Sequence, residues 1–373
     1  MQPMHNNLQK FLETKGAEYA PFDPSRALRI YECFRRDFLG NFLPKVIHIV
    51  GTNGKGSTGR YIALSLAKHY QILHFTSPHL FEFNERFYCN DGYLAWEKLQ
   101  KAHQEIIQKA YMEEASYFEY ATFMALYLAR DRDFLILEAG LGGEFDSTNV
   151  LSEKISVFTQ IGLDHMEFLG DRIEEIARTK LNAMGKIAFI GIQKYSQVLP
   201  IAQEIAQKKH TRLEVLREYP IASNFPLFLS QNFALAQKVL EFLGVEICAI
   251  EELNLIGRMQ RVKKNIWLDV GHNLDSALAI ADELQGKKVV LVYNAYKQKD
   301  IDAILGVFKD CVTRVEIISV FHERIIPKRI LQDKLERLKI PYSDFCGFNS
   351  WEDYLVFGSF SVVSEVMRQY LER

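Results

Sequence analysis

The sequence lacks the features that mark secreted, membrane-spanning or strongly charged proteins. Lysine and arginine number 45 against 47 aspartates and glutamates, so the formal net charge is only −2. This balance gives no global electrostatic signal for nucleic acid or an anionic membrane, although it allows a local basic groove. No apolar run approaches the roughly 18 residues of a membrane span. The N-terminal MQPMHNNLQK also lacks the basic and apolar segments of a signal peptide.

Cysteine is scarce and shows no paired spacing. The five cysteines are odd in number and form no CxxC motif, which argues against a disulfide framework or a structural zinc site. We therefore expect these cysteines to act as small buried hydrophobic residues, in a protein of the reducing cytoplasm. They are Cys33, Cys89, Cys248, Cys311 and Cys346.

What remains is the composition of an ordinary globular protein. At about 100–200 residues per domain, a chain of 373 residues predicts two domains. Hydrophobic residues make up 48% and charged residues 25%, which excludes a disordered chain and allows a sizeable core. We place the boundary near Asn254–Gly257, which gives domains of residues 1–254 and 255–373.

Short apolar runs alternate with longer helical patterns in both parts of the chain. Continuous apolar strands between helices predict a parallel sheet covered on both faces. Asp171 and Glu174 predict an N-cap and capping box for the helix that carries Lys180. The expected strands are 46–50, 72–75, 134–138, 155–161 and 187–190, then 266–270, 289–293, 315–320 and 354–357. The expected helices include 55–69, 94–113, 117–130, 232–243 and 362–371.

The strongest local signal is HIVGTNGKGST at residues 48–58, where a strand leads through glycines into a helix. Glycines bring backbone N–H groups close to phosphate oxygens, and the helix directs its positive end at the same anion. Lys55 is placed to reach the outer phosphates, and Ser57 or Thr58 offers a hydroxyl to Mg²⁺. The segment therefore predicts a nucleotide triphosphate site but not a reaction.

The spacing of this loop departs from the usual G-x-x-x-x-G-K-[ST]. Only two residues separate Gly51 from Gly54, and Gly56 stands between the lysine and Ser57. The alternative is an ordinary strand–helix turn with a solvated lysine. We expect a P-loop-type α/β domain with a parallel sheet, followed by a smaller Rossmann-like α/β domain.

Polar residues follow three further strands, and loops at the carboxyl ends of parallel strands share one edge. Ser77 and His79 follow one strand, Glu138 ends another, and His165 with Asp164 follows a third. Oxygen ligands suit Mg²⁺, and an imidazole ligand indicates tolerance of Mn²⁺. The alternatives stay open residue by residue. A histidine after a strand is more often structural, and a serine before proline is often a turn residue.

Taken together, these residues resemble the folylpolyglutamate synthase/dihydrofolate synthase family, within the muramyl-ligase-like amide ligases. The resemblance covers most of the chain in order, and the ordered set is far more specific than any one segment. The segments are HIVGTNGKGST (48–58), TSPHL and NERF (within 76–87), YFEYATF (117–123), LEAGLGGEFDSTNV (137–150), IGLDHMEFLG (161–170), ARTKLNAMGK (177–186), IGRMQ (256–260), LDVGHN (268–273), KD (299–300) and VFGSF (356–360).

The resemblance implies a reaction. The γ-phosphoryl group of ATP passes to a carboxylate, and the amine of L-glutamate attacks the resulting acyl phosphate. Two anions must approach each other, so cationic groups and Mg²⁺ must neutralise charge. A cleft closing between two domains would keep water from the acyl phosphate. The implied catalytic residues are Lys55, His165 and Lys180, the last matching a lysine that the family carbamylates with CO₂.

The resemblance also implies ligand-binding residues. For the metal these are Ser57, Ser77, Glu138, His165 and Lys180. For ATP they are Thr52, Asn53, Gly54, Lys55, Gly56, Ser57, Thr58, Asn232, Arg258, Asp269 and His272. For a pterin or folate they are Ser116, Tyr117, Phe118, Glu119 and Phe145, whose aromatic members can stack on a flat ring or simply pack in the core.

Some positions depart from the family pattern. The usual GLGGRLDATN is GLGGEFDSTN here, so Glu144 replaces an arginine and Phe145 a leucine. The usual PGR is IGR at 256–258, and DGAHN is DVGHN. The lysine segment is TKLNAMGK in place of EKAGI, which keeps the lysine but not its neighbours. The charge reversal at Glu144 leaves the contacts to the substrate tail open.

Two other functions compete with a folate ligase. A muramyl ligase of peptidoglycan synthesis usually has an extra N-terminal domain, whereas only about 45 residues precede the phosphate loop here. A nucleotide-binding switch without ligation would not need Glu138, His165 and Lys180. We therefore expect a cytoplasmic, monomeric enzyme acting on ATP, L-glutamate and dihydropteroate or a reduced folate, with no nucleic-acid or membrane partner.

Overall fold

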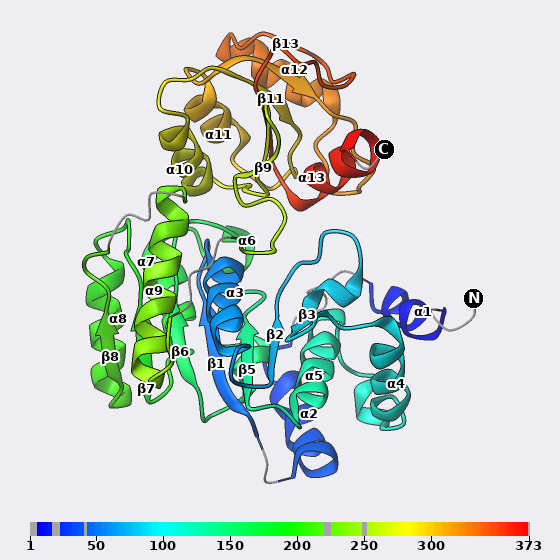
Figure 1. Cartoon of the computed structure of the whole chain (residues 1–373), viewed down its shortest axis with the longest axis vertical. Coiled ribbons are helices and arrows are strands. Elements are labelled where there is room, and N and C mark those ends of the chain that lie inside the picture. The colour runs from blue at the N-terminus through cyan, green and yellow to red at the C-terminus, as the bar shows by residue number, and fades with distance from the viewer. Residues whose placement is uncertain (1–5, 17–22, 41–42, 220–224, 248–251, 372–373) are drawn as a thin grey trace. The chain divides into compact units, whose positions relative to one another are not determined.

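The computed structural model describes residues 6–16, 23–40, 43–219, 225–247 and 252–371 (Figure 1). The chain divides into two compact units. The first extends through residue 253, and the second comprises residues 254–371 together with residues 225–228. In the described part of the chain, no helix has both the length and the hydropathy needed to cross a membrane.

The first unit is built on a sheet that contains eight of the described strands, in the order β4–β3–β2–β5–β1–β6–β7–β8. Within this order, β2, β5, β1, β6, β7 and β8 pair in parallel. At one end of the sheet, β3 pairs antiparallel with both β2 and β4. The loops after β2, β5, β1 and β6 therefore share one edge. The bounds are β1 (Lys45–Val50), β2 (Ile72–Phe75), β3 (Phe87–Cys89), β4 (Gly92–Tyr93), β5 (Phe134–Glu138), β6 (Ile155–Phe158), β7 (Ile187–Ile190) and β8 (Arg212–Val215).

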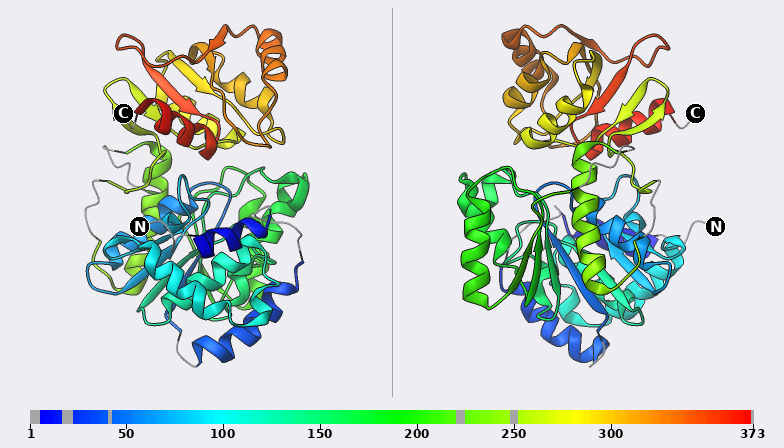
Figure 2. Two further views of the ribbon diagram at one scale, coloured as in Figure 1. Left: turned by 90° about the vertical axis from the view of Figure 1, so that its right-hand side faces the viewer. Right: turned by 60° about the vertical axis from the view of Figure 1, so that its left-hand side comes forward.

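Helices cover both faces of this sheet (Figure 2). Helices α5, α7 and α8 pack on one face, while α3 and α9 pack on the other, where the rings of Tyr61 and Phe233 meet at 4.9 Å. The described helices are α1 (Asn6–Thr14), α2 (Arg26–Phe34), α3 (Lys55–Leu66), α4 (Trp96–Ile106), α5 (Tyr117–Ala129), α6 (Met166–Leu169), α7 (Ile173–Leu181), α8 (Val198–Lys209) and α9 (Leu227–Leu243). A π-helical turn spans Arg35–Leu39, and 3₁₀ turns span Phe83–Arg86, Ala110–Met112 and Ser147–Val150.

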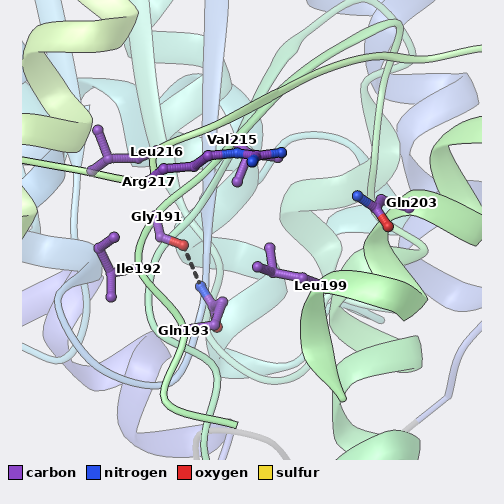
Figure 3. Close-up of a pocket in the computed structure, with 8 residues that line it drawn as sticks. All are labelled: Gly191, Ile192, Gln193, Leu199, Gln203, Val215, Leu216 and Arg217. Carbon is purple, nitrogen blue, oxygen red and sulfur yellow. Dashed lines mark hydrogen bonds between the residues drawn. The ribbon is translucent and has the colours of Figure 1, made fainter. Parts of the chain in front are cut away.

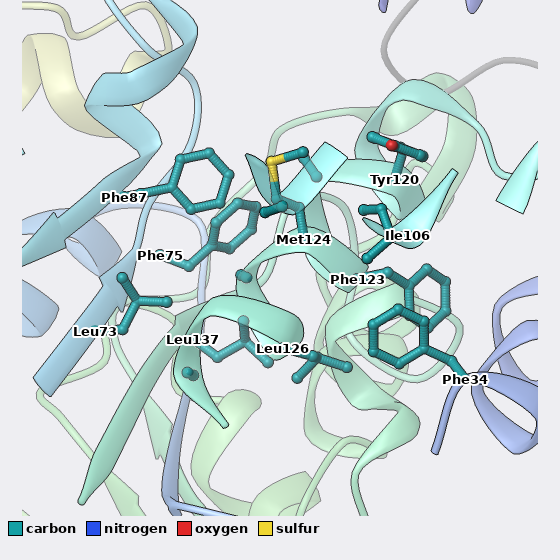
Figure 4. Packing of buried hydrophobic residues seen from close by; sticks show 14 of the residues in the cluster. Phe34, Leu73, Phe75, Phe87, Ile106, Tyr120, Phe123, Met124, Leu126 and Leu137 are labelled. Atoms are coloured by element: carbon teal, nitrogen blue, oxygen red, sulfur yellow. The ribbon is translucent and has the colours of Figure 1, made fainter. Parts of the chain in front are cut away.

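Successive side chains of a strand point to opposite faces of the sheet, and this explains why helices cover both faces. In β5, Leu135 and Leu137 join the core under α5, whereas the neighbouring Ile136 is equally buried on the opposite face. Both faces are apolar, so neither can be left to solvent. Figure 4 shows the core under α5, where Phe75 and Phe87 lie beside Met124 of the helix. Burial of this many large side chains is the main stabilising contribution to the unit.

The second unit contains a smaller sheet of the same kind. Its described strands follow the order β13–β12–β11–β14–β10–β9, with only β9 pairing antiparallel. The strands are β9 (Gln260–Lys263), β10 (Ile266–Leu268), β11 (Val289–Tyr293), β12 (Val312–Ile317), β13 (Tyr342–Asp344) and β14 (Tyr354–Phe357). The helices are α10 (Leu274–Leu284), α11 (Ile301–Phe308), α12 (Lys328–Leu338) and α13 (Phe360–Val366), followed by a π-helical turn at Met367–Leu371.

The predicted α/β class and most of the predicted strands are confirmed. The strands expected at 72–75, 134–138, 187–190, 289–293 and 354–357 coincide with β2, β5, β7, β11 and β14. The strand expected at 155–161 ends at Phe158, because the carbonyl of Gln160 turns to accept the N–H groups of the glycine-rich loop. Five short strands were not predicted: β3, β4, β8, β9 and β13. Of these, β4, β8, β9 and β13 lie at sheet edges, and β3 has only three residues.

Three local predictions are wrong. The helix that carries Lys180 begins at Ile173 with Arg172 as its N-cap, and the Glu175 carboxylate accepts the Arg172 N–H at 3.4 Å, so the cap lies one residue after the predicted pair. The helix expected at 94–113 ends at Ile106. Cys89 is buried as expected, but Cys346 is exposed, and Cys248 lies outside the described residues.

Candidate active site

The loop between β1 and α3 is as tight as its glycines suggest. Gly54 has a φ of 87°, in the left-handed region that favours glycine. A Cβ atom added there would lie 2.2 Å from Oδ1 of Asn232, and one added at Gly51 would lie 1.9 Å from Oγ1 of Thr159. Neither position has room for a side chain. Because Asn232 touches the loop from α9, the predicted nucleotide contact lies beside the predicted phosphate site.

The first residues of the loop anchor it to the segment after β6. The backbone N–H groups of Thr52 and Asn53 donate to the carbonyl of Gln160 at 2.8 and 3.2 Å. The Thr52 hydroxyl donates to the carbonyl of Gly162 and accepts its N–H, both at 3.0 Å. These groups are engaged within the protein. The N–H groups offered to an anion are therefore those of the first turn of α3, which begins at Lys55.

Two lysines converge on one atom of this loop. The Lys55 ammonium donates to the carbonyl oxygens of Gly51 and Thr52 at 3.2 and 3.4 Å. The Lys180 ammonium reaches the same Gly51 oxygen at 3.1 Å from the last turn of α7. Sequence separation between the two lysines is large, so only the fold brings them together.

Lys180 is buried with 5% of its surface exposed. Its pKa falls from 10.5 to about 7, chiefly because of burial and also because of the nearby Lys55 charge, while Asp164 and Asp146 partly oppose the shift. A large fraction of the side chain is therefore neutral near pH 7. A neutral amine is a nucleophile, whereas an ammonium is not.

Glu138 is buried at the end of β5, with 3% of its surface exposed. Its Oε2 atom accepts the hydroxyl of Thr76 and the N–H of Ser77, the latter at 3.3 Å. The carboxylate thus lies against the loop that follows β2. A buried carboxylate is costly unless a cation or donors compensate its charge.

The remaining predicted metal and phosphate residues occupy the same edge. Ser57 and Thr58 are buried in the first turn of α3, and Oγ1 of Thr58 has no hydrogen-bond partner among the described residues. His165 adopts a left-handed conformation with φ 52° before α6, and its N–H donates to the Asp164 carboxylate at 2.9 Å. His165 follows β6 and Glu138 ends β5, and only β1 lies between these two strands in the sheet.

His79 has a structural role in the loop after β2. Its Nδ1 atom accepts from Nε of Arg86 at 2.9 Å, and burial together with the Arg86 charge lowers its pKa to about 3. It is therefore neutral at physiological pH and fixes the loop that carries Ser77. Arg86 is also buried beside the ring of Tyr117, at 5.3 Å.

In the second unit, the predicted nucleotide residues gather at the carboxyl end of β10. The buried Asp269 carboxylate accepts the N–H groups of Met259 and Gly271 at 2.8 and 2.7 Å, and burial raises its pKa. It holds the segment of Arg258 on one side and that of His272 on the other. The His272 ring contacts the Val270 carbonyl at 3.0 Å.

Four of the five predicted pterin residues line a small pocket of about 40 Å³ in the first unit. Glu119 organises its rim, because its carboxylate accepts from Nε of Arg26 and from the N–H of Ser116, both at 2.7 Å. Tyr117 does not line this pocket and faces Arg86 instead. The lining residues are Arg26, Ser116, Phe118, Glu119, Leu141, Phe145, Asp146 and Ser147.

Four lining residues were not predicted as pterin contacts from the sequence: Arg26, Leu141, Asp146 and Ser147. Asp146 is buried and accepts the N–H groups of Gly140 and Leu141 at 3.0 and 2.7 Å, and burial raises its pKa. The motif GLGGEFDSTN contains this aspartate and was the available signal. Arg26 had no signal, because it lies in an unremarkable helix far away in sequence.

A second pocket of about 380 Å³ lies elsewhere in the first unit (Figure 3). Loop residues after β7 form one wall, and Leu199 and Gln203 of α8 form another. The side chain of Gln193 is already bonded to the Gly191 carbonyl at 3.0 Å. None of the predicted site residues lines this pocket, so its size does not connect it with the chemistry above.

Among the described residues, no group of three or more histidine, cysteine, aspartate or glutamate side chains is arranged to hold a metal ion. The predicted metal set contains only Glu138 and His165 of these types, with serine and lysine side chains completing it. Such a sparse set suits Mg²⁺, which keeps several waters and shares phosphate oxygens with its substrate.

Comparison with known proteins agrees with this arrangement. Residues 49–258 match the model of the Mur ligase middle domain. The dihydrofolate synthase/folylpolyglutamate synthase of Buchnera aphidicola is 33% identical over 367 residues, covering 85% of this chain and 86% of that protein.

Two solved structures are similar over nearly the whole chain. Folylpolyglutamate synthetase of Helicobacter pylori is 42% identical, with a TM-score of 0.77 and 98% of each chain covered. The bifunctional folylpolyglutamate synthase/dihydrofolate synthase of Yersinia pestis, complexed with AMPPNP and a manganese ion, is 25% identical, with a TM-score of 0.82 and 99% of each chain covered. The chain therefore belongs to the folylpolyglutamate synthase/dihydrofolate synthase family of ATP-dependent ligases.

Proposed function

We propose that this protein uses ATP to join L-glutamate to the carboxyl group of a folate-type acid. The acid is dihydropteroate, the glutamate tail of a reduced folate, or both. Family membership supports the class of reaction. The AMPPNP and manganese ion in the Yersinia pestis structure support ATP with a divalent cation, and the bifunctional name of that relative supports both acids as candidates.

One observation carries the proposal: Lys55 and Lys180 meet at the Gly51 carbonyl, at the entrance to α3. Transfer of a phosphoryl group to a carboxylate brings two anions together, and this requires fixed positive charge and N–H donors. The first turn of α3 supplies the donors. Lys55 supplies a mobile ammonium that is free to exchange a carbonyl for a phosphate oxygen.

The donor set fits a divalent cation. Glu138 offers a buried carboxylate beside Ser77, and Ser57 offers a buried hydroxyl in the phosphate loop. We assign these three residues and His165 to the cation, with Lys180 as a further member if it is carbamylated. The cation would supply charge neutralisation at the β- and γ-phosphates of ATP.

The chemical steps follow from these positions. An oxygen of the substrate carboxylate attacks the γ-phosphorus of ATP, and the bond to ADP breaks. The amine of L-glutamate then attacks the acyl carbon, inorganic phosphate leaves, and the amine loses a proton. Phe145 lies at the pocket of Arg26 and Glu119 with 49% of its surface exposed, so its ring is available to stack on the flat ring of the acid, whereas Phe118 packs in the core. Asn232 is the nucleotide contact that we assign in the first unit, and Arg258, Asp269 and His272 are those that we assign in the second.

The environment of Lys180 supports a carbamate at this residue. Its neutral amine can add to CO₂ with release of one proton, which converts a cation into an oxygen-donating anion. We expect Lys180→Ala to lose most of the ligase activity while remaining folded. Acetate or another small carboxylate should restore part of the rate. No gain with acetate, in a folded variant that has lost activity, would contradict the carbamate and leave an amine role.

The decisive experiment measures phosphate release from ATP with each acid in turn. We expect release only when L-glutamate is present together with dihydropteroate or tetrahydrofolate, and mass spectrometry should detect the product extended by one glutamate. Comparison of the two acids then measures the balance of the two activities. Release that depends only on a nucleotide-sugar acid would support a muramyl ligase instead. Hydrolysis that neither acid stimulates would remove the ligase assignment.

A further inference from the structure

Two residues at which this chain departs from the family pattern contact each other next to Lys180. Nδ2 of Asn182 donates to Oε2 of Glu144 at 2.8 Å. Glu144 stands where the family usually has arginine. With the lysines aligned, Asn182 stands at the glycine of EKAGI. A contact between two such departures indicates that they serve one structural purpose.

Glu144 forms hydrogen bonds with residues on both sides of Lys180 in the chain. The backbone N–H of Glu144 donates to the carbonyl of Thr179 at 2.8 Å, one residue before the lysine, and its side chain binds Asn182, two residues after it. Asn182 is the residue at which α7 ends. The helix turn that carries Lys180 is therefore held between two hydrogen bonds from a single residue.

Packing in this region leaves little freedom for the helix turn. A Cβ atom added at Gly143 would lie 2.7 Å from the carbonyl oxygen and 2.9 Å from the Cα atom of Lys180. The loop backbone thus lies directly on the backbone of the lysine. A small shift of the loop would move the Lys180 amine relative to the Gly51 carbonyl, which it contacts at 3.1 Å.

Two further groups form hydrogen bonds with Glu144 and Asn182. Nδ2 of Asn149 donates to the Glu144 carbonyl at 2.8 Å, and the Lys209 ammonium donates to the carbonyl of Asn182 from the end of α8. Burial lowers the pKa of Lys209, and the nearby Glu144 carboxylate partly opposes this shift, so the two charges attract. The contacts of Glu144 with Thr179 and Asn182 therefore act on the position of Lys180.

We propose that Glu144 and Asn182, termed here the 144–182 clasp, are positioning residues that hold Lys180 against the phosphate loop. This inference rests on the proposed function, because it assumes that the Lys180 side chain takes part in ligation. The clasp replaces the arginine and glycine of the family pattern with a hydrogen-bonded pair. It fixes the lysine in place through hydrogen bonds on both sides of it.

The test compares Glu144→Ala, Glu144→Gln, Asn182→Ala and the double alanine variant. Glutamine keeps an amide oxygen that can accept from Asn182, so we expect Glu144→Gln to stay within about twofold of the unchanged enzyme. Glu144→Ala and Asn182→Ala should each lower kcat roughly 5- to 20-fold with little change in KM for ATP. Because the two residues act as a pair, the double variant should be no slower than the slower single variant.

Arg178→Ala is the matched control. Arg178 lies on the same helix and makes a two-point ion pair with Glu204 at 2.8 and 3.2 Å, but on the exposed side. Its loss removes a comparable contact without touching the loop of Glu144. We expect kcat to stay within about twofold. Equal losses in the control and the clasp variants would mean that only general helix stability is involved.

A second readout does not depend on turnover. The rate at which cyanate modifies the Lys180 amine at one fixed pH, followed by mass spectrometry, reports the accessibility of this amine. We expect Glu144→Ala to raise this rate at least about twofold, because a loosened loop exposes the amine, and Glu144→Gln to leave it unchanged. An unchanged rate and unchanged kcat in Glu144→Ala, or fully multiplicative losses in the double variant, would overturn the clasp. Absence of ligase activity in the unaltered protein would overturn the proposed function instead, and the cyanate rate would still judge the clasp.

Discussion

Lys55 and Lys180 donate to the same atom, the backbone carbonyl oxygen of Gly51, at 3.2 and 3.1 Å. Two ammonium groups on one carbonyl repel each other, and the buried partner responds by losing affinity for its proton. The pKa of Lys180 falls to about 7, chiefly through burial and further through Lys55. Lys55 thus supplies a cation that can bind a phosphate oxygen, and Lys180 supplies an amine that is partly neutral.

This pair predicts a pH dependence of stability. The pKa of Lys180 is lower in the folded chain than its ordinary value of 10.5, so between about pH 7 and 10.5 the unfolded chain binds a proton that the folded chain lacks. The free energy of unfolding therefore rises with pH by up to about 1.4 kcal/mol per pH unit from this group. Lys180→Met removes that contribution.

Urea unfolding of the unchanged protein and Lys180→Met, in CO₂-depleted buffer at about pH 6.5, 7.5 and 8.5, measures this effect. We expect the methionine variant to be the more stable protein at the lowest pH. Its advantage should shrink as the pH rises. Parallel stability curves for the two proteins would show that Lys180 keeps an ordinary pKa.

Glu138→Gln tests the metal assignment. The amide oxygen can still accept from Thr76 and Ser77, but the negative charge is lost. We expect ligase activity to fall about 100-fold or more, with a higher Mg²⁺ concentration needed for half-maximal rate. Manganese binding followed by electron paramagnetic resonance should weaken in parallel.

Glu316→Gln is the control for this change. Glu316 is also buried, with 7% exposed, but it pairs with Arg314 in the second unit. We expect no change in metal dependence. Equal Mg²⁺ requirements for Glu138→Gln and the unchanged enzyme would place the cation elsewhere.

Phe145→Ala tests the pocket of Arg26 and Glu119. Phe145 lines this pocket with 49% of its surface exposed, so its loss should not weaken the core. We expect KM for dihydropteroate or tetrahydrofolate to rise roughly 2- to 12-fold, because an aromatic contact with a flat ring is worth about 0.5–1.5 kcal/mol. KM for ATP should stay constant. Phe321→Ala, which removes a fully exposed ring in the second unit, should change neither value.

Gly54→Ala tests the phosphate loop, with Gly244→Ala as its control. Both glycines are left-handed, with φ of 87° and 68°, so alanine costs roughly 1–2 kcal/mol of strain at either position. Only at Gly54 would the new Cβ atom meet a neighbour, Oδ1 of Asn232 at 2.2 Å. We expect kcat/KM for ATP to fall more than about tenfold in Gly54→Ala alone. Similar ATP kinetics in the two variants would indicate that the loop does not hold the phosphates.

The sequence by itself determined the class of fold and the kind of chemistry. Periods of apolar residues marked β1, β2, β5 and β7, because strands buried on both faces must be continuously apolar. The glycines and lysine of residues 48–58 predicted the phosphate loop, because few other backbones can surround a phosphate. The cap of α7 lies one residue after the predicted Asp171, at Arg172, although aspartate is the better N-cap residue, so local preference did not decide this boundary.

Only the tertiary structure decided which distant residues meet. No local pattern could show that Lys180 reaches the Gly51 carbonyl, that Arg26 joins Glu119, or that Glu144 binds Asn182. These contacts depend on the order of strands in the sheet, on the packing of α2 against α5 and on the packing of α7 against the sheet. The lowered pKa of Lys180 has the same origin, because burial is a property of the packed fold and not of the helix that carries the residue.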